Sequence, residues 1–60
     1  MGVEKLYGEQ GTQAMVLGRQ IYRANESRKA SLIQDKILEG LKKAGFSYEI
    51  AARVVWEIGN

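Results

Sequence analysis

The stretch Leu41-Lys42-Lys43-Ala44-Gly45-Phe46-Ser47-Tyr48-Glu49 decides the fold, because it ends one helix and begins another within a few residues. Gly45 fits the position after a helix C-terminus, where a left-handed backbone brings no Cβ penalty. Ser47 is a good N-cap for the following helix, and Glu49 falls in its first turn, where the helix dipole favours an acid. The stretch therefore predicts a sharp helix–turn–helix boundary with a positive φ at Gly45.

Upstream of this turn, apolar residues recur between residues 28 and 44 with the spacing of one helical face. This stripe consists of Ala30, Ile33, Ile37, Leu38, Leu41 and Ala44. The segment Asn25-Glu26-Ser27 interrupts the pattern, and either Asn25 or Ser27 would cap the helix that follows. We therefore expect the chain to reverse near residues 25–27. The alternative is that one helix runs straight through, since this segment contains neither proline nor glycine.

A further helix is expected from Thr12, a candidate N-cap, to Ala24. Its apolar face would consist of Ala14, Leu17, Gly18 and Ile21. Gly18 costs about 1 kcal/mol relative to alanine inside a helix, which favours a close approach of another backbone at this position. The alternative is a tolerated, exposed glycine.

Residues 1–11 have the composition of a flexible arm, because they combine three glycines with few apolar residues. The alternative is an arm that docks through Leu6 and Tyr7. The sequence thus predicts an all-α fold in which a single helical domain, residues 12–60, follows the arm. Its three helices are expected near residues 12–24, 28–44 and 48–58.

The last of these helices is apolar on nearly all sides, and its polar residues form one row at i, i+4 spacing, Glu49, Arg53 and Glu57. A stripe predicted to pack on the core consists of Ala51, Val54, Val55 and Ile58. A second stripe consists of Tyr48, Ala52 and Trp56. A helix that is apolar nearly all round is expected to be buried nearly all round, which 60 residues can hardly achieve.

The second stripe is therefore predicted to contact a partner protein or a second copy of the chain in a homodimer. The competing interpretation is that the helix near residues 12–24 crosses this flank and Gly18 receives the ring of Trp56.

Composition excludes most catalytic and metal-binding chemistry. The chain has no histidine and no cysteine, which most nucleophile–base pairs and transition-metal sites require. We expect no enzymatic activity, no cofactor, no metal and no small-molecule substrate. No apolar run approaches the roughly 20 residues of a membrane span, and the first residues lack a signal-peptide pattern. The expected location is cytoplasmic, without membrane contact.

Positive charge is concentrated on Arg19, Arg23, Arg28 and Lys29, in a chain whose net charge is +2. Such a cluster could follow the phosphates of a nucleic acid. The turn at Gly45 would then belong to a helix-turn-helix, with the last helix as its recognition helix. The alternative is a solvated or ion-paired basic face.

Residues 41–60 resemble the first two helices of ubiquitin-associated (UBA-type) domains, which show an apolar residue four positions before a Gly-Phe loop. The matching positions are Leu41, Gly45, Phe46, Ala51, Val54, Val55 and Asn60. Ala44 stands where those domains usually carry methionine. The stretch is also similar to one helical repeat of the RecX regulators of recombinase filaments, which carry a Gly-Phe turn followed by Ser-Tyr and an acid. Both resemblances imply a helical hairpin with a binding role.

The sequence thus predicts a small non-catalytic protein–protein interaction module, a regulator or inhibitor that acts by occluding a surface. Its contact residues would be Tyr48, Ala52 and Trp56. The alternative is a small nucleic-acid-binding regulator that uses the four basic residues and the helix-turn-helix-like hairpin.

Overall fold

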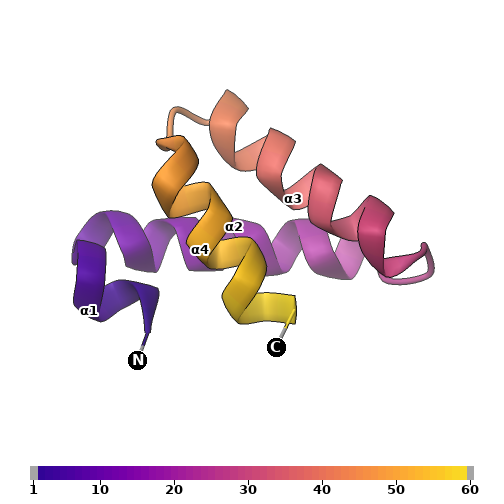
Figure 1. The fold of residues 1–60 in the computed structure, drawn as a ribbon, viewed down its shortest axis with the longest axis horizontal. Helices are drawn as coiled ribbons and strands as arrows, with labels where there is room; N and C mark the ends of the chain where they lie inside the picture. The colour runs from indigo at the N-terminus through magenta and orange to yellow at the C-terminus, as the bar shows by residue number, and fades with distance from the viewer. Residues whose placement is uncertain (1, 60) are drawn as a thin grey trace.

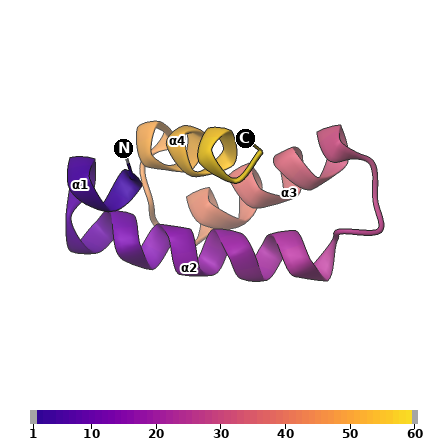
Figure 2. The ribbon, with the colours of Figure 1, turned by 90° about the horizontal axis from the view of Figure 1, so that it is seen from below.

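The computed structural model describes residues 2–59, and these residues form four α-helices. They are α1 (Val3–Tyr7), α2 (Glu9–Ala24), α3 (Ala30–Lys43) and α4 (Tyr48–Gly59). The predicted all-α class is confirmed. The long helix α2 lies behind α3 and α4 (Figure 1). The view from below shows two layers, with α2 in one and the other three helices opposite it (Figure 2).

The core lies where the two layers meet. Its buried side chains are Val3 from α1, Ala14 and Met15 from α2, Ile33, Ile37 and Leu41 from α3, and Ile50, Ala51 and Val54 from α4. The centre of the stripe predicted on α3 is therefore buried, whereas its two end alanines are exposed. One side of α4 is buried as predicted, and Ile50 extends that side beyond the predicted stripe.

The turn between α3 and α4 has the predicted geometry. Gly45 has a φ of 102°, and the N–H of Phe46 donates to the carbonyl of Leu41 at 3.1 Å, as in a Schellman motif. The N–H of Ile50 donates to the hydroxyl oxygen of Ser47 at 3.3 Å, so Ser47 caps α4. Local signals thus set the direction in which α4 leaves α3.

Gly18 lies at a close contact between α2 and α4, as predicted. A Cβ at this position would lie 2.6 Å from Cγ1 of Val54 and 3.1 Å from Cδ1 of Ile58. The neighbours are therefore side chains, whereas another backbone was expected. The interpretation that Gly18 receives the ring of Trp56 is wrong, because Trp56 is 64% exposed.

Residues 2–11 correct the expectation of a flexible arm over residues 1–11, of which Met1 lies outside the described residues. Helix α1 packs on α2 and α4, and Val3 is only 2% exposed. Helix α2 begins at Glu9, so Thr12 lies inside it and is not its N-cap. The physical reason is close packing: a Cβ at Gly11 would overlap the carbonyl of Val3. The lack of a side chain therefore lets the two helices meet.

The reversal between α2 and α3 occurs where it was predicted, but the capping differs. The side-chain amide of Asn25 donates to the carbonyl of Ile21 at 2.8 Å, so Asn25 provides a hydrogen-bond partner for a carbonyl in the last turn of α2. Helix α3 begins at Ala30, and Lys29 occupies its N-cap position without a side-chain hydrogen bond. The prediction that Asn25 or Ser27 caps α3 is wrong, because the connection extends two residues further.

Candidate protein-binding face

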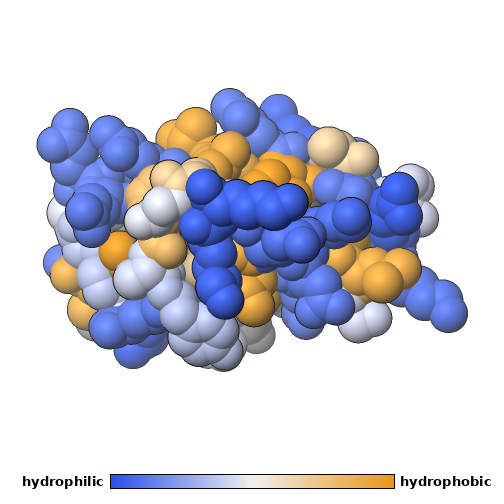
Figure 3. Space-filling view, turned by 90° about the horizontal axis from the view of Figure 1, so that it is seen from above, coloured by the Kyte–Doolittle hydropathy of each residue, from blue (hydrophilic) through white to orange (hydrophobic). Residues whose placement is uncertain are grey.

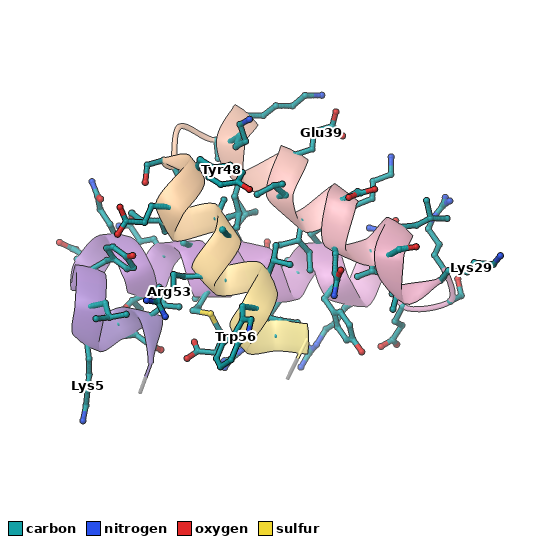
Figure 4. All side chains as sticks on the ribbon, in the orientation of Figure 1. Lys5, Lys29, Glu39, Tyr48, Arg53 and Trp56 are labelled. Atoms are coloured by element: carbon teal, nitrogen blue, oxygen red, sulfur yellow. The ribbon has the colours of Figure 1, made fainter. Side chains whose placement is uncertain are left out.

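The side of α4 that points away from the core carries the stripe Tyr48, Ala52 and Trp56, which we call the outer α4 face. Its two aromatic side chains are 63% and 64% exposed, and Ala52 between them is half-buried. A spacing of four residues places the three on one side of a helix, and Figure 4 shows the labelled aromatic residues at two levels of α4. This face is therefore at the surface of the folded chain.

The polar row of α4 runs along one edge of the outer α4 face and is held by α1. The hydroxyl of Tyr7 donates to Oε2 of Glu49 at 2.7 Å, and the N–H of Val3 donates to Oε2 of Glu57 at 3.3 Å. The hydrogen bond to Glu49 raises the pKa of Tyr7 above its usual value, against the opposing effect of Arg53. Helix α1 thus orders one edge of the face.

A shallow, open depression of about 440 Å³ lies on the outer α4 face, bounded by its three residues together with Glu49 and Arg53. It adjoins a groove of about 200 Å³ between α3 and α4. That groove is lined by Gln34, Asp35, Leu38, Tyr48, Ala52 and Val55. The face therefore extends toward α3, a contribution that sequence reasoning missed although Gln34 and Leu38 stand at i, i+4.

Other exposed apolar side chains do not gather in a comparable way. Leu6, Val16 and Leu32 are about half-exposed, and they belong to three different helices. On the face seen from above, apolar patches are separated by hydrophilic residues (Figure 3). Among residues 2–59, the two most exposed large apolar side chains are thus Tyr48 and Trp56, both on the outer α4 face.

The four basic residues of the predicted cluster do not line a common depression on the surface. Arg19 and Arg23 line a shallow depression on α2 together with Val16, on the side opposite the buried residues of that helix. Arg28 lines a different groove, between the start of α3 and the end of α4. Lys29 lies at the start of α3, far from α4 in Figure 4. The predicted cluster is therefore split between the surface of α2 and the α2–α3 connection.

Two further searches concern metals and membranes. Within residues 2–59 no three acidic side chains gather into a group that could hold a metal ion. In the same part of the chain, every helix is too short or too polar to cross a membrane.

Comparison of the chain with protein-family models, with curated proteins and with solved structures finds no match. The resemblances to UBA-type domains and to the RecX repeat stay predictions. The function of the chain is therefore inferred from the geometry of its surface.

Proposed function

We propose that this protein is a small non-catalytic interaction module, a regulator or inhibitor that binds a protein surface through the outer α4 face. The supporting observation is the exposure of Tyr48 and Trp56, at 63% and 64%, on a helix whose other side is packed in the core. Aromatic anchors dominate the binding energy of protein interfaces when they enter pockets. A rigid helix presents both at little cost in conformational entropy.

Occlusion is the mode of action that fits such a molecule. The chain measures 30 × 23 × 16 Å, and its outer α4 face bears no group with evident catalytic chemistry. When the outer α4 face is bound to a partner, α2 and α3 would cover the neighbouring surface of that partner and exclude competing molecules. The regulatory effect would then follow from volume and affinity alone.

The proposal is tested by protein capture from the cells that make this chain, with Trp56→Ala and Leu32→Ala compared against the parent. Leu32 is an exposed apolar residue of α3 outside the face, so its variant is the matched control. We expect proteins that the parent and Leu32→Ala retain and that Trp56→Ala loses. Equal retention by all three chains would contradict the proposal.

The alternative is a nucleic-acid-binding regulator, and one observation favours it: Arg19 and Arg23 are both exposed on one side of α2. The geometry of the hairpin weighs against it. By helical position, Arg19 and Arg23 fall on the side of α2 away from its buried residues, whereas α4 lies in the layer opposite α2 (Figure 2). The last helix, which would be the recognition helix, presents Glu49 beside Arg53. One straight duplex would not contact both surfaces.

The alternative has its own measurement, the affinity for generic duplex DNA at several salt concentrations. Phosphate contacts make such affinity fall steeply with salt. Under the alternative, Arg19→Ala combined with Arg23→Ala would weaken binding and flatten the slope. Under the protein-binding proposal, affinity for DNA is weak and unaffected by these changes.

A further inference from the structure

We propose that α1 is an N-terminal strap, which detaches from the molecule as a unit by rotation about Gly8 while α2, α3 and α4 stay folded. This inference goes beyond the proposed function and holds whether or not the outer α4 face binds a partner. It concerns the polar row of α4, because α1 binds Glu49 and Glu57 when it is docked and releases both when it detaches. The polar row therefore exists in a bound and a free form.

The first argument is how little of the core α1 supplies. Of the nine buried apolar side chains within residues 2–59, Val3 is the only one from α1, and the other eight come from the three remaining helices. Leu6 is about half-exposed, and Tyr7 is half-buried. Helices α2, α3 and α4 therefore keep almost the whole core when α1 leaves.

The second argument is that α1 has no helical stability of its own. It has five residues, and isolated helices shorter than about 12–15 residues are marginal in water. Helix α1 is therefore helical only while it is docked, so detachment and loss of the helix form one cooperative step. The N–H of Gly8, which donates to the carbonyl of Glu4 at 2.8 Å, loses its partner in that step.

The third argument is that the hydrogen bonds from α1 to α4 lie at or near the surface. The hydroxyl of Tyr7 donates to the exposed carboxylate of Glu49. The N–H of Val3 donates to the carboxylate of the half-buried Glu57. Exchanging such a hydrogen bond for one to water has a small net cost, and detachment leaves both carboxylates in water.

Gly8 is the hinge, because it alone joins α1 to α2. Its φ of 63° and ψ of −134° lie in a region that glycine adopts freely and that residues with a Cβ avoid. Nothing lies within 4 Å of a Cβ placed there, so no packed neighbour hinders rotation. Helix α1 lies at the end of α2 that is far from the α2–α3 connection (Figure 2), so its departure leaves that connection in place.

The docked position of α1 is nevertheless specific, because α2 contains a glycine whose nearest neighbours belong to α1. Gly11 is buried inside α2, where glycine is less favourable than alanine. A Cβ there would overlap the carbonyl of Val3, so the glycine permits the close approach of the two helices. The docked form is thus a defined arrangement, which distinguishes α1 from a frayed chain end.

Detachment changes the surface beside the outer α4 face. Glu49 borders the depression on that face, and its carboxylate accepts from Tyr7 only in the docked form. A molecule that binds the freed carboxylate shifts the equilibrium toward the detached form. Helix α1 thus competes with such a molecule, which makes its docking an autoinhibitory contact within one chain.

The test uses two buried valines as sites for thiol probes in a chain without cysteine. Val3→Cys reports on α1, and Val54→Cys is the matched control in the core of α4. Reaction with an excess of a thiol reagent is followed at urea concentrations below the unfolding transition. We expect Val3→Cys to react at least about 100-fold faster than Val54→Cys. Its rate should depend little on urea, because detachment exposes little surface, whereas the rate of Val54→Cys should rise steeply.

The unaltered chain provides a second measurement, hydrogen exchange of the Gly8 amide read by NMR. Gly8 follows the last residue of α1, so fraying at Val3 leaves its hydrogen bond to Glu4 in place. We expect this amide to exchange with the weak urea dependence of Val3→Cys. The amide of Val54 should show the steep dependence of global unfolding.

A further variant tests the docked contact itself. In the Val3→Cys chain, Gly11→Ala places a methyl group against the carbonyl of residue 3 and should speed the reaction of the thiol at least about tenfold. The chain should stay helical by circular dichroism, since alanine favours α2. Gly40→Ala is the matched control, because a Cβ there meets Ile21 of α2 and no residue of α1, and it should leave the rate unchanged.

Each outcome decides the inference. Equal rates and equal urea dependence for Val3→Cys and Val54→Cys mean that α1 leaves only when the whole chain unfolds, and they overturn it. A fast Val3→Cys combined with a Gly8 amide as protected as that of Val54 shows fraying of the first residues and overturns detachment as a unit. Capture of partners that depends on Trp56 is unaffected by either result, so the strap and the proposed function fail separately.

Discussion

The two sides of α4 are both apolar, yet they have opposite positions in the fold. Ala51 and Val54 are completely buried, whereas Tyr48 and Trp56 are among the most exposed apolar residues. The difference arises because α2 and α3 pack on one side of α4, and α1 forms hydrogen bonds with Glu49 and Glu57 of its polar row. An apolar stripe therefore predicts burial only where the chain has another element left to cover it.

The largest expected effect is on the inner side of α4. Ile50→Ala should lower the free energy of unfolding by about 2–5 kcal/mol, because it removes buried side-chain volume. Trp56→Ala on the outer α4 face should lower it by clearly less than Ile50→Ala, because the Trp56 side chain is 64% exposed. Urea unfolding at low protein concentration measures both, and equal losses would contradict the distinction between the two sides.

A smaller effect is expected at the turn that orients α4. Gly45→Val should destabilise the protein by about 1–2 kcal/mol, because a left-handed backbone is unfavourable for a residue with a Cβ. Nothing lies within 4 Å of a Cβ placed there, so the loss comes from the backbone alone. Gly45→Asn should lose less, since asparagine tolerates this conformation. Thermal melts that rank asparagine below valine would be inconsistent with this explanation.

The packing of α2 against the inner side of α4 gives a third prediction. Gly18→Ala should cost about 1 kcal/mol, because overpacking against Val54 outweighs the better helix propensity of alanine. Combined with Val54→Ala, the loss should be smaller than the sum of the two single losses.

Gly40→Ala is the matched control for this prediction. Its Cβ would meet only the terminal methyl region of the half-buried Ile21 side chain, which can rotate away. If the losses in free energy of unfolding caused by Gly18→Ala and Val54→Ala were strictly additive in urea unfolding, Gly18 would not be in contact with the inner side of α4.

The smallest effect concerns the edge of the outer α4 face. The hydrogen bond to Glu49 raises the pKa of Tyr7, so its stabilising effect is present below about pH 10 and is lost as the pH rises through the raised value. The parent should therefore lose more stability than Tyr7→Phe between neutral pH and pH 11. Melting temperatures of both chains across this range provide the measurement, and parallel curves would contradict the assigned contact.

The hairpin of α3 and α4 could be predicted because its signals are local. Gly45 and Ser47 act on backbone groups within a few residues, and both do so in the structure. The N-terminal helix could not be predicted, because its contacts join residues far apart in sequence. The bond from Val3 to Glu57 spans 54 residues, and the bond from Tyr7 to Glu49 spans 42.

The candidate site was predictable to a similar extent. Helical spacing grouped Tyr48, Ala52 and Trp56, but their exposure depends on which side of α4 meets the other helices. The groove beside α3 required the packing angle between two elements. The basic residues were grouped because they are close in sequence, whereas the end of α2 at Ala24 places Arg28 on a different surface from Arg19.

The central claim, that the outer α4 face is a binding surface and not part of the core, is tested most directly by the fluorescence of Trp56. It is the only tryptophan of the chain, so its quenching by acrylamide reports on this face alone. We expect strong quenching in dilute, folded protein, and protection with a blue-shifted emission when a captured partner is added. Protection that persists at every dilution at which the chain is still helical would place Trp56 in the monomer core and contradict the claim.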